Sequence, residues 1–516
     1  MVRTRLHLLA AAAIIFSAGA AYADDYTDLL EILRAKGSLT QGEYNSLRAK
    51  HIRNLRTGRS GISGGTAAAS AEEASQAAMR AAAAAEAARQ TMMQTQLEMK
   101  KTEDMMNQPD IVKAMPYKPG AGLTIKVGNV DLNVSGIVNA FYTYSSADSA
   151  TPNHSVAGGL TDASGFDSSS VRNGLLPGAI IVSAATQQDG IDLTAVFGAY
   201  PGINSSAVGA LNANNGGNAT ALGTAGIDFR KTYITAGTPQ FGTIKLGRDI
   251  GLFGQDAILN DQTLLGVGAT GGNADPGNTS LGRIGYGYIY ADFMPQITYI
   301  SPTFAGFQAS VGLFQPLNEF DFSGVSGSAG AHNTPMFQGR LTYDYKADNW
   351  STHLWAGFVT QPQQDILVTN AAGITHTKSD TAAAGEGGAS FTFGPVGVLG
   401  YYYRGNGVGT TALFFDGLSE NGQFRDSEGG YVQAFVKATK KLKLIASYGE
   451  SSLYLAPGEY NPQLVRRNES ETAGAYYALT DWLTLVGEYT HTDSHAHDSF
   501  YNSAANSVSA GAILFY

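Results

Sequence analysis

The chain has 516 residues, of which 63 are Gly and none is Cys, and only 15% are charged. Soluble domains contain about 25% charged residues and about 7% Gly, so much of this protein's surface is not expected to face water. The absence of Cys excludes disulfides, zinc–thiolate sites and thiol catalysis. A formal net charge of −10 argues against a nucleic-acid partner, which requires a basic surface.

Helical membrane spans are excluded by the length of the apolar runs. The longest run, Leu8 to Ala21, is shorter than the ~20 residues that a spanning helix needs. It fits the apolar centre of a secretory signal, with basic residues before it and a small-x-small cleavage site at Ala21-Tyr22-Ala23. We therefore expect residues 1–23 to be a signal peptide and the mature chain to be exported.

The next segment, residues 24–108, carries helical patterns. Apolar positions at helical spacing lie on both sides of a break at Gly37, and Thr40 and Glu43 form a capping box, so residues 24–56 are predicted to be a short helical hairpin. Residues 57–70 are Gly/Ser-rich and are predicted to be a flexible linker.

Residues 71–108 are predicted to be an Ala-rich helix with a seven-residue register. This register is the seam pattern of a coiled coil, although Ala and Thr bury little area. Self-association and a single solvated helix are both open interpretations. The two columns of the register are Ala71, Ala78, Ala85, Met92, Met99 and Met106, and Ala74, Ala81, Ala88, Thr95 and Thr102.

From residue 120 to the C-terminus the pattern changes to an alternation of period two. In Val130 to Tyr144, apolar residues occupy one face and polar residues the other, over more than the ~10 residues of a tilted membrane strand. The same alternation returns at 191–199, 337–345 and 483–490. Such strands are typical of a barrel wall with lipid on one side and water on the other.

Short and long connections alternate along this region. Seven tight turns are predicted, at 188–190, 238–242, 302–306, 347–350, 394–397, 440–441 and 480–482. Eight longer loops are predicted, near 146–175, 201–225, 249–284, 317–334, 361–380, 405–428, 451–470 and 491–505.

These connections predict sixteen strands, with 14 or 18 as alternatives, and place both barrel ends on the side of the short turns. Bacterial outer-membrane barrels have this asymmetry, with short periplasmic turns and long external loops. The predicted fold class is therefore all-β: a transmembrane antiparallel β-barrel over residues 120–516, preceded by the helical hairpin and the Ala-rich helix.

The last strand and one internal hairpin resemble those of the Gram-negative general porins. The chain ends on Tyr516, and the last strand of those porins ends on an aromatic residue that the outer-membrane assembly machinery reads. Residues 230–248 resemble the strand–turn–strand before the pore loop, and residues 301–307 resemble the next turn of the family. The resemblance covers about residues 123–516. The outward face of the last strand would consist of Val508, Ala510, Ala512, Leu514 and Tyr516.

The resemblance implies a homotrimeric outer-membrane channel, in contact with lipid and lipopolysaccharide, that passes ions and small hydrophilic solutes. It also implies that the third long loop folds inward and narrows the lumen, although this chain lacks the Pro-Glu-Phe-Gly-Gly turn of the enterobacterial members. The loop is acidic and the facing wall is basic, and the net acidity suggests a mild cation preference. The candidate constriction residues are Asp249, Asp256, Asp261, Asp275, Arg230, Lys245, Arg283 and Arg340.

Other functions are open to the same sequence. A channel specific for a sugar or an anion needs an aromatic track or a Lys/Arg ladder, and neither is clear. The N-terminal helices would lie in the periplasm and could tether the barrel to the cell wall. No nucleophile–base arrangement can be read, so we expect neither an enzyme nor a cofactor. His491, His495 and His497 are weak candidates for a metal site, and solvated histidines are the simpler interpretation.

Overall fold

The computed structural model describes residues 31, 34, 41–56, 64–106, 112–117, 120–147, 155–162, 164–203, 227–274, 276–369 and 375–516. The predicted signal peptide, residues 1–23, lies outside these residues. The chain divides into two units, Met1–Glu103 and Asp104–Tyr516. Within the described part of the chain, no helix is both long and apolar enough to cross a bilayer.

The N-terminal unit contains two long helical elements, α2 (Gln41–Arg56) and most of α3 (Gly64–Met106). The buried Tyr44 of α2 donates a hydrogen bond to Glu31 at 3.2 Å, and the guanidinium of Arg34 lies 4.7 Å from its ring centroid. Residues 64–70 are helical, so the predicted linker over 57–70 is too long. Ala-rich sequence has high helix propensity, which extends α3 into this stretch.

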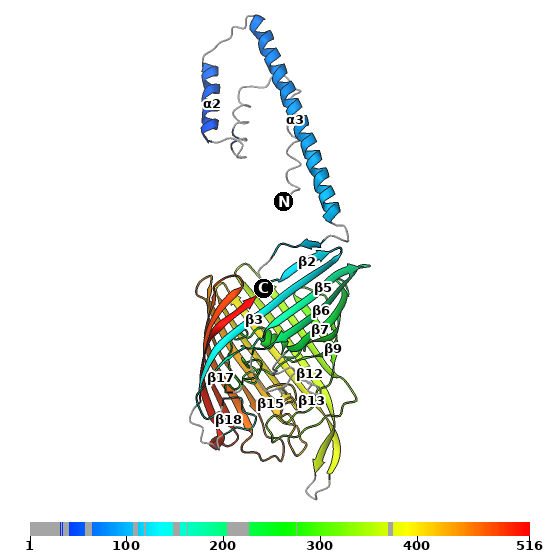
Figure 1. Ribbon diagram of the computed structural model, residues 1–516, viewed down its shortest axis with the longest axis vertical. Helices are drawn as coiled ribbons and strands as arrows, with labels where there is room; N and C mark the ends of the chain where they lie inside the picture. Colours follow the sequence, from blue (N-terminus) through cyan, green and yellow to red (C-terminus); the bar gives the residue numbers. More distant parts are fainter. Residues whose placement is uncertain are drawn as a thin grey trace. The chain divides into compact units, whose positions relative to one another are not determined.

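The second unit is a closed antiparallel barrel of sixteen strands, as predicted (Figure 1). Three further strands, β1 (Val112–Ala114), β2 (Leu123–Val127) and β4 (Ser168–Arg172), extend the sheet beside β3. The barrel strands are β3 (Val130–Ala147), β5 (Ala179–Gln188), β6 (Ile191–Pro201), β7 (Ile227–Thr238), β8 (Gly242–Ile250), β9 (Phe293–Ile300), β10 (Phe307–Phe314), β11 (Met336–Lys346), β12 (Trp350–Thr369), β13 (Thr375–Phe393), β14 (Val396–Asn406), β15 (Asp426–Lys437), β16 (Leu442–Leu453), β17 (Val465–Ala478), β18 (Leu483–Ala496) and β19 (Ser503–Phe515).

The barrel closes where the first wall strand meets the last. β3 pairs with β19 in the register Val138↔Leu514, and Gly136 exchanges two backbone hydrogen bonds of 3.1 Å with Tyr516. Beyond that point β2 pairs with β3, in the register Leu123↔Val134. Every strand of the wall therefore has a partner on both edges, which a bilayer requires because it offers no water to the backbone.

The alternation of the sequence matches the two faces of this wall. On β19, Val508 is 54% exposed, whereas the flanking Ser507 and Ser509 are buried. On β3, Tyr142 is exposed and Thr143 is buried in the same way. The exposed apolar residues form the face that meets lipid, and the polar residues point inward.

All seven predicted tight turns join paired strands, for example at 189–190 between β5 and β6. Two predicted long loops are wrong in part. Residues 361–380 belong mostly to β12 and β13, and residues 491–505 mostly to β18 and β19. Polar residues in these stretches indicated loops, but strands that continue beyond the lipid can be polar on both faces and still pair through their backbones.

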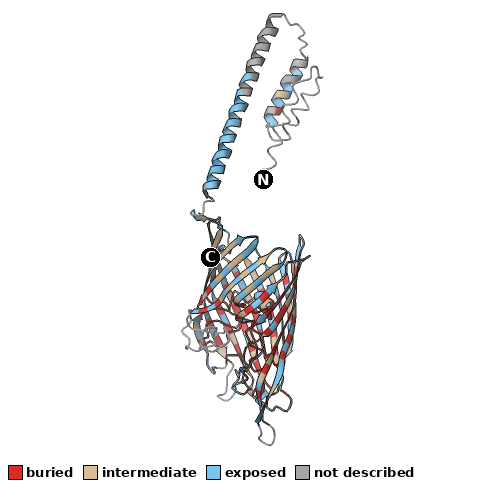
Figure 2. Cartoon of the chain, turned by 90° about the vertical axis from the view of Figure 1, so that its right-hand side faces the viewer, coloured by how far each residue is buried: buried red, intermediate tan, exposed pale blue. Residues whose placement is uncertain are grey.

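Burial differs between the two ends of the barrel. Figure 2 shows buried positions gathered in the half of the wall towards the long loops, whereas the half beside the C-terminus is mostly exposed or intermediate. The buried half is filled by loop residues that pack inside the barrel, including Tyr288, Phe414 and Phe415. The wall therefore opens into a wide space on the short-turn side.

The contact between Gly136 and Tyr516 generates a prediction about stability. A Cβ atom at position 136 would lie 2.2 Å from the ring of Tyr516, so Gly136→Val should displace this ring and lower the stability of the barrel by about 1–3 kcal/mol. The loss should appear as a lower unfolding temperature on heat-modifiability gels. Gly487→Ala is the control, because a Cβ at that strand position meets no atom within 4 Å. Equal unfolding temperatures of the two variants would contradict the prediction.

Candidate functional site

The long segment between β8 and β9, residues 251–292, folds into the barrel and carries the short helix α4 (Gln255–Leu259). Phe253 and Ile289 of this segment, which we call the inner loop, are fully buried. Its apolar residues share one core with wall residues such as Trp355 and Tyr401. The inner loop is therefore packed into the lumen as part of the barrel's interior.

Polar side chains of the wall bind the backbone of the inner loop. On β11, the amide oxygen of Gln338 accepts hydrogen bonds from the backbone N–H groups of Leu252 at 2.7 Å and Phe253 at 3.0 Å. On β13, the carboxylate of Glu386 accepts from the N–H of Gly254 at 2.9 Å. These wall groups satisfy backbone donors that have no secondary structure to pair with.

A second carboxylate binds the loop on the far side of the lumen. Glu488 of β18 accepts from the N–H groups of Val267 at 2.7 Å and Gly268 at 2.9 Å. Tyr476 of β17 donates its hydroxyl to the same carboxylate. The inner loop thus runs across the barrel from β8 and is held by strands on several sides. Neither Glu386 nor Glu488 was predicted as a site residue; the available signal was a lone acid beside Gly on an inward face.

Asp256 of α4 forms the main ion pair between the inner loop and the wall. Arg340 of β11 donates two hydrogen bonds to its carboxylate, one of them at 2.8 Å. His353 of β12 contacts the same carboxylate at 3.1 Å, and its other ring nitrogen lies 2.8 Å from Asp344. The structure therefore brings the candidates Asp256 and Arg340 together and adds His353 and Asp344, which the sequence did not indicate.

The other acidic candidates of this region are also buried and bonded. Asp249 pairs with Lys245 on the same strand, β8. Asp261 accepts hydrogen bonds from the hydroxyl of Tyr288 at 2.9 Å and from the amide of Gln433 at 2.8 Å. Asp275 lies outside the described residues. The acids that the structure describes are thus neutralised or solvated by protein groups.

Two basic candidates have structural partners of their own. Arg230 of β7 is buried, pairs with Asp228 at 2.9 Å, and lies 5.7 Å from the ring centroid of Tyr200. Arg283 is fully buried, and its guanidinium donates to Ser470 at 3.0 Å and to Ser447 rather than to a carboxylate. These arginines hold the loop and the wall together, so a basic wall opposite an acidic loop is only partly realised, at Lys245 and Arg340.

The histidine candidates lie on β18 and just after it. The ligand atoms of Glu469, Asp493 and His495 lie within 4.8 Å of one another. However, the amide of Asn502 accepts from the N–H of Ala496 and thereby directs its NH₂ group to Nδ1 of His495, at 3.0 Å. Nδ1 must then accept, so Nε2 carries the proton and donates to Glu469. This tautomer favours hydrogen bonding over metal binding.

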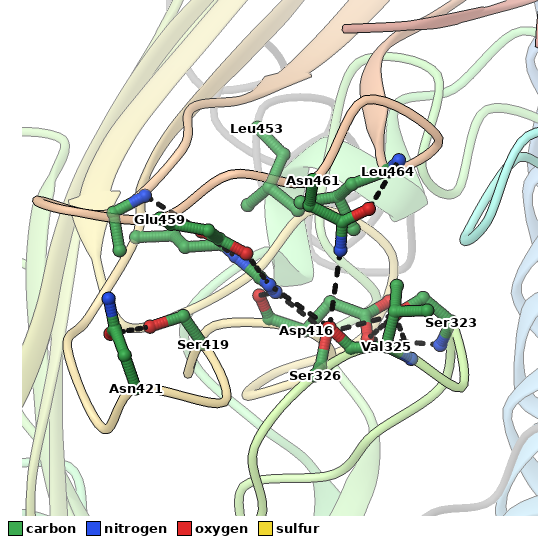
Figure 3. Close-up of polar contacts among 12 residues, drawn as sticks. Ser323, Val325, Ser326, Asp416, Ser419, Asn421, Leu453, Glu459, Asn461 and Leu464 are labelled. Carbon is green, nitrogen blue, oxygen red and sulfur yellow. Dashed lines mark hydrogen bonds and ion pairs between the residues drawn. The ribbon is translucent and has the colours of Figure 1, made fainter. Parts of the chain in front are cut away.

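Three external loops meet at the mouth of the barrel, as the labelled residues in Figure 3 show. Arg425 is fully buried and donates to Glu459 at 2.9 Å, to the hydroxyl of Ser326 at 2.7 Å and to the carbonyl of Asp416 at 2.8 Å. One guanidinium therefore joins the segments 315–335, 407–425 and 454–464.

The fold and the inner loop define a channel-forming outer-membrane barrel. The chain belongs to the Gram-negative porin family, whose sequence profile matches residues 74–497. No curated protein sequence matches the chain. The protein is thus an outer-membrane porin, a channel for passive diffusion of ions and small hydrophilic solutes.

Solved structures share this fold. The outer membrane channel DcaP of Acinetobacter baumannii is similar with a TM-score of 0.55 at 14% identity, covering 77% of this chain and 100% of that chain. The anion-selective porin from Comamonas acidovorans is similar with a TM-score of 0.47 at 14% identity, covering 75% of this chain and 100% of that one. The family and the barrel expected from the sequence are confirmed.

The anchoring of the inner loop by Glu488 can be tested by amide exchange. Glu488→Ala leaves the N–H groups of Val267 and Gly268 without their acceptor, and an unsatisfied buried donor costs about 1–3 kcal/mol. Hydrogen exchange in peptides covering these residues should become about tenfold faster or more. Glu471→Ala, on the outward face of neighbouring β17, should leave exchange unchanged. Slow exchange in both variants would show that Glu488 is not an anchor.

Proposed function

We propose that the inner loop sets the aperture of this porin and that Asp256, Arg340 and Lys245 lie at its edge. The carrying observation is the position of the loop, which crosses the lumen and is bonded to β11, β13 and β18. The part of the loop around α4 faces the open half of the barrel, since Leu259 is 52% exposed. Solutes that traverse the barrel pass this segment.

The charges around this aperture support a weak ion preference. Each described acid of the inner loop has a cationic or hydrogen-bonding partner, and paired charges attract mobile ions less than isolated ones do. At the mouth, burial raises the pKa of Glu319 well above its usual range, so this carboxyl carries little negative charge at neutral pH. The overall acidity of the chain therefore does not predict the selectivity of the passage.

Two lysines give the lumen beneath the inner loop a positive character. Lys443 and Lys437 are cross-strand neighbours on β16 and β15. The ammonium of Lys443 contacts the side chain of Gln262 at 3.3 Å and lies 4.9 Å from the ring centroid of Tyr476. Two like charges side by side near the aperture favour anions, so the proposed preference is weakly anionic and replaces the cation preference expected from the net charge.

Reversal potentials across a bilayer under a KCl gradient test this proposal. The wild-type channel should favour chloride, and replacing both lysines (Lys437→Gln with Lys443→Gln) should reduce the chloride-to-potassium permeability ratio by about twofold or more, because a unit charge at ~8 Å in water changes local ion energies by a fraction of RT to about RT. Lys440→Gln, in the exposed turn, is the matched control and should change the ratio little. Clear cation selectivity of the wild type would reject the anion preference.

We further propose a homotrimer with the N-terminal unit in the periplasm. The outward face of β5 to β8 supports this: it is apolar and forms a groove of about 440 Å³ lined by residues that include Val182, Phe197 and Ile234. These strands are shorter than β12 and β13, so this side of the wall is low. On the opposite side, Tyr448 donates to Glu450 at 3.0 Å above the apolar belt, where we place the headgroups of lipopolysaccharide.

The exposed seam of α3 supports self-association of the N-terminal unit. Met92 is 54% and Met99 is 61% exposed, and both belong to one column of the heptad register. A 43-residue helix with no contact along such a seam gains stability by pairing with copies of itself. Binding of the cell wall through the same helix is the competing proposal.

Heat dissociation of trimers on semi-native gels tests the role of the seam. The double variant Met92→Glu with Met99→Glu places charges in the seam, so its trimers should dissociate at a lower temperature than those of the wild type. Met93→Glu, one position off the seam and equally exposed, should have no effect. If the seam variant keeps its trimers but loses attachment to purified cell wall, the tethering proposal is favoured instead.

A further inference from the structure

His353 stands between two carboxylates inside the barrel. Its Nδ1 lies 2.8 Å from Asp344, the residue directly opposite it on β11. Its Nε2 lies 3.1 Å from Asp256, in α4 of the inner loop. One contact is therefore within the wall, and the other joins the wall to the loop.

The protonation state of His353 decides whether both contacts exist. A neutral imidazole has one N–H and one lone pair, whereas an imidazolium donates through both nitrogens. Ionised carboxylates can only accept. The observed pair of contacts is therefore complete only when His353 carries a proton on each nitrogen.

The charged groups around His353 balance when it is protonated. Arg340 binds Asp256 from the same side as His353 does, so two cations face two aspartates. Trp355 stacks on the imidazole at 5.4 Å. From β13, Glu386 lies behind α4, where it is bonded to the N–H of Gly254 and to a tyrosine hydroxyl. Loss of the proton from His353 leaves this group of residues with one uncompensated negative charge.

The loop contact is the one that a neutral His353 would lose. Nδ1 lies closer to its carboxylate than Nε2 does, and Asp256 has Arg340 as a second partner whereas Asp344 has none of this kind among the described ion pairs. The remaining proton thus stays on Nδ1, and the lone pair of Nε2 then faces an oxygen of Asp256. This arrangement is repulsive and pushes α4 away from β12.

We propose that His353 is a positioning residue that couples the inner loop to pH. In acid it fixes α4 against the wall, and as the pH rises through the range in which histidine titrates, about 5 to 8, it releases the helix and leaves a negative charge at the aperture. The inference rests on the proposal that the inner loop bounds the aperture. Deprotonation shifts the channel towards cations.

Bilayer recordings of the full-length protein at pH 5.5 and pH 8.5 test this inference. The potassium-to-chloride permeability ratio of the wild type should rise by about twofold from the lower to the higher pH. His353→Gln, which is neutral throughout, should give the same ratio at both values. His491→Gln is the matched control, because this histidine is paired with Asp493 on the outward face of β18 and should keep the wild-type response.

A second variant keeps the inference testable if His353→Gln does not fold. Asp344→Asn changes an exposed side chain and removes the charge that stabilises the imidazolium, so the midpoint of the pH response should move to a more acidic value. A wild-type response in His353→Gln, or an unmoved midpoint in Asp344→Asn, would overturn the inference. Failure of the aperture proposal is recognised separately: Glu488→Ala would then leave the conductance unchanged at every pH.

Discussion

The backbone of this protein must find all its hydrogen-bond partners within the chain. In the bilayer no water is available, so the wall is a closed sheet in which β19 pairs with β3 through the contact of Tyr516 with Gly136. The same requirement applies inside the barrel. The inner loop has no ladder of its own, and its exposed N–H groups are taken by Gln338, Glu386 and Glu488. Closure of the wall and placement of the loop thus answer the same need.

The wall could be predicted from the sequence because lipid imposes a simple pattern. Each strand must show apolar residues at every second position, and turns such as 480–482 interrupt that pattern visibly. Where lipid ends the pattern ends too, although pairing continues. For this reason the outer parts of β12 and β13 were predicted as loop, since their polar residues carry no alternation that lipid enforces.

The candidate site could be predicted only in outline. The acidic loop and Arg340 were identified by their charge and their place before and after the inward-folding segment. Glu386, Glu488 and His353 were missed because an inward polar residue looks the same in sequence whether it faces water or binds a loop. Which of these occurs depends on the path of the loop, and that path is set by contacts between residues more than a hundred positions apart.

The junction at Arg425 has a consequence for how the outer surface of this protein can vary. Of its three partners, Glu459 and Ser326 bind through their side chains, whereas Asp416 binds through a backbone carbonyl that any residue supplies. Residues at the loop surfaces, such as Phe322 and Tyr460, are exposed and make no part of this junction. Mutations can therefore accumulate on the face that the cell presents to its surroundings while the entrance keeps its shape. Selection on surface identity and selection on permeation act on separate residues.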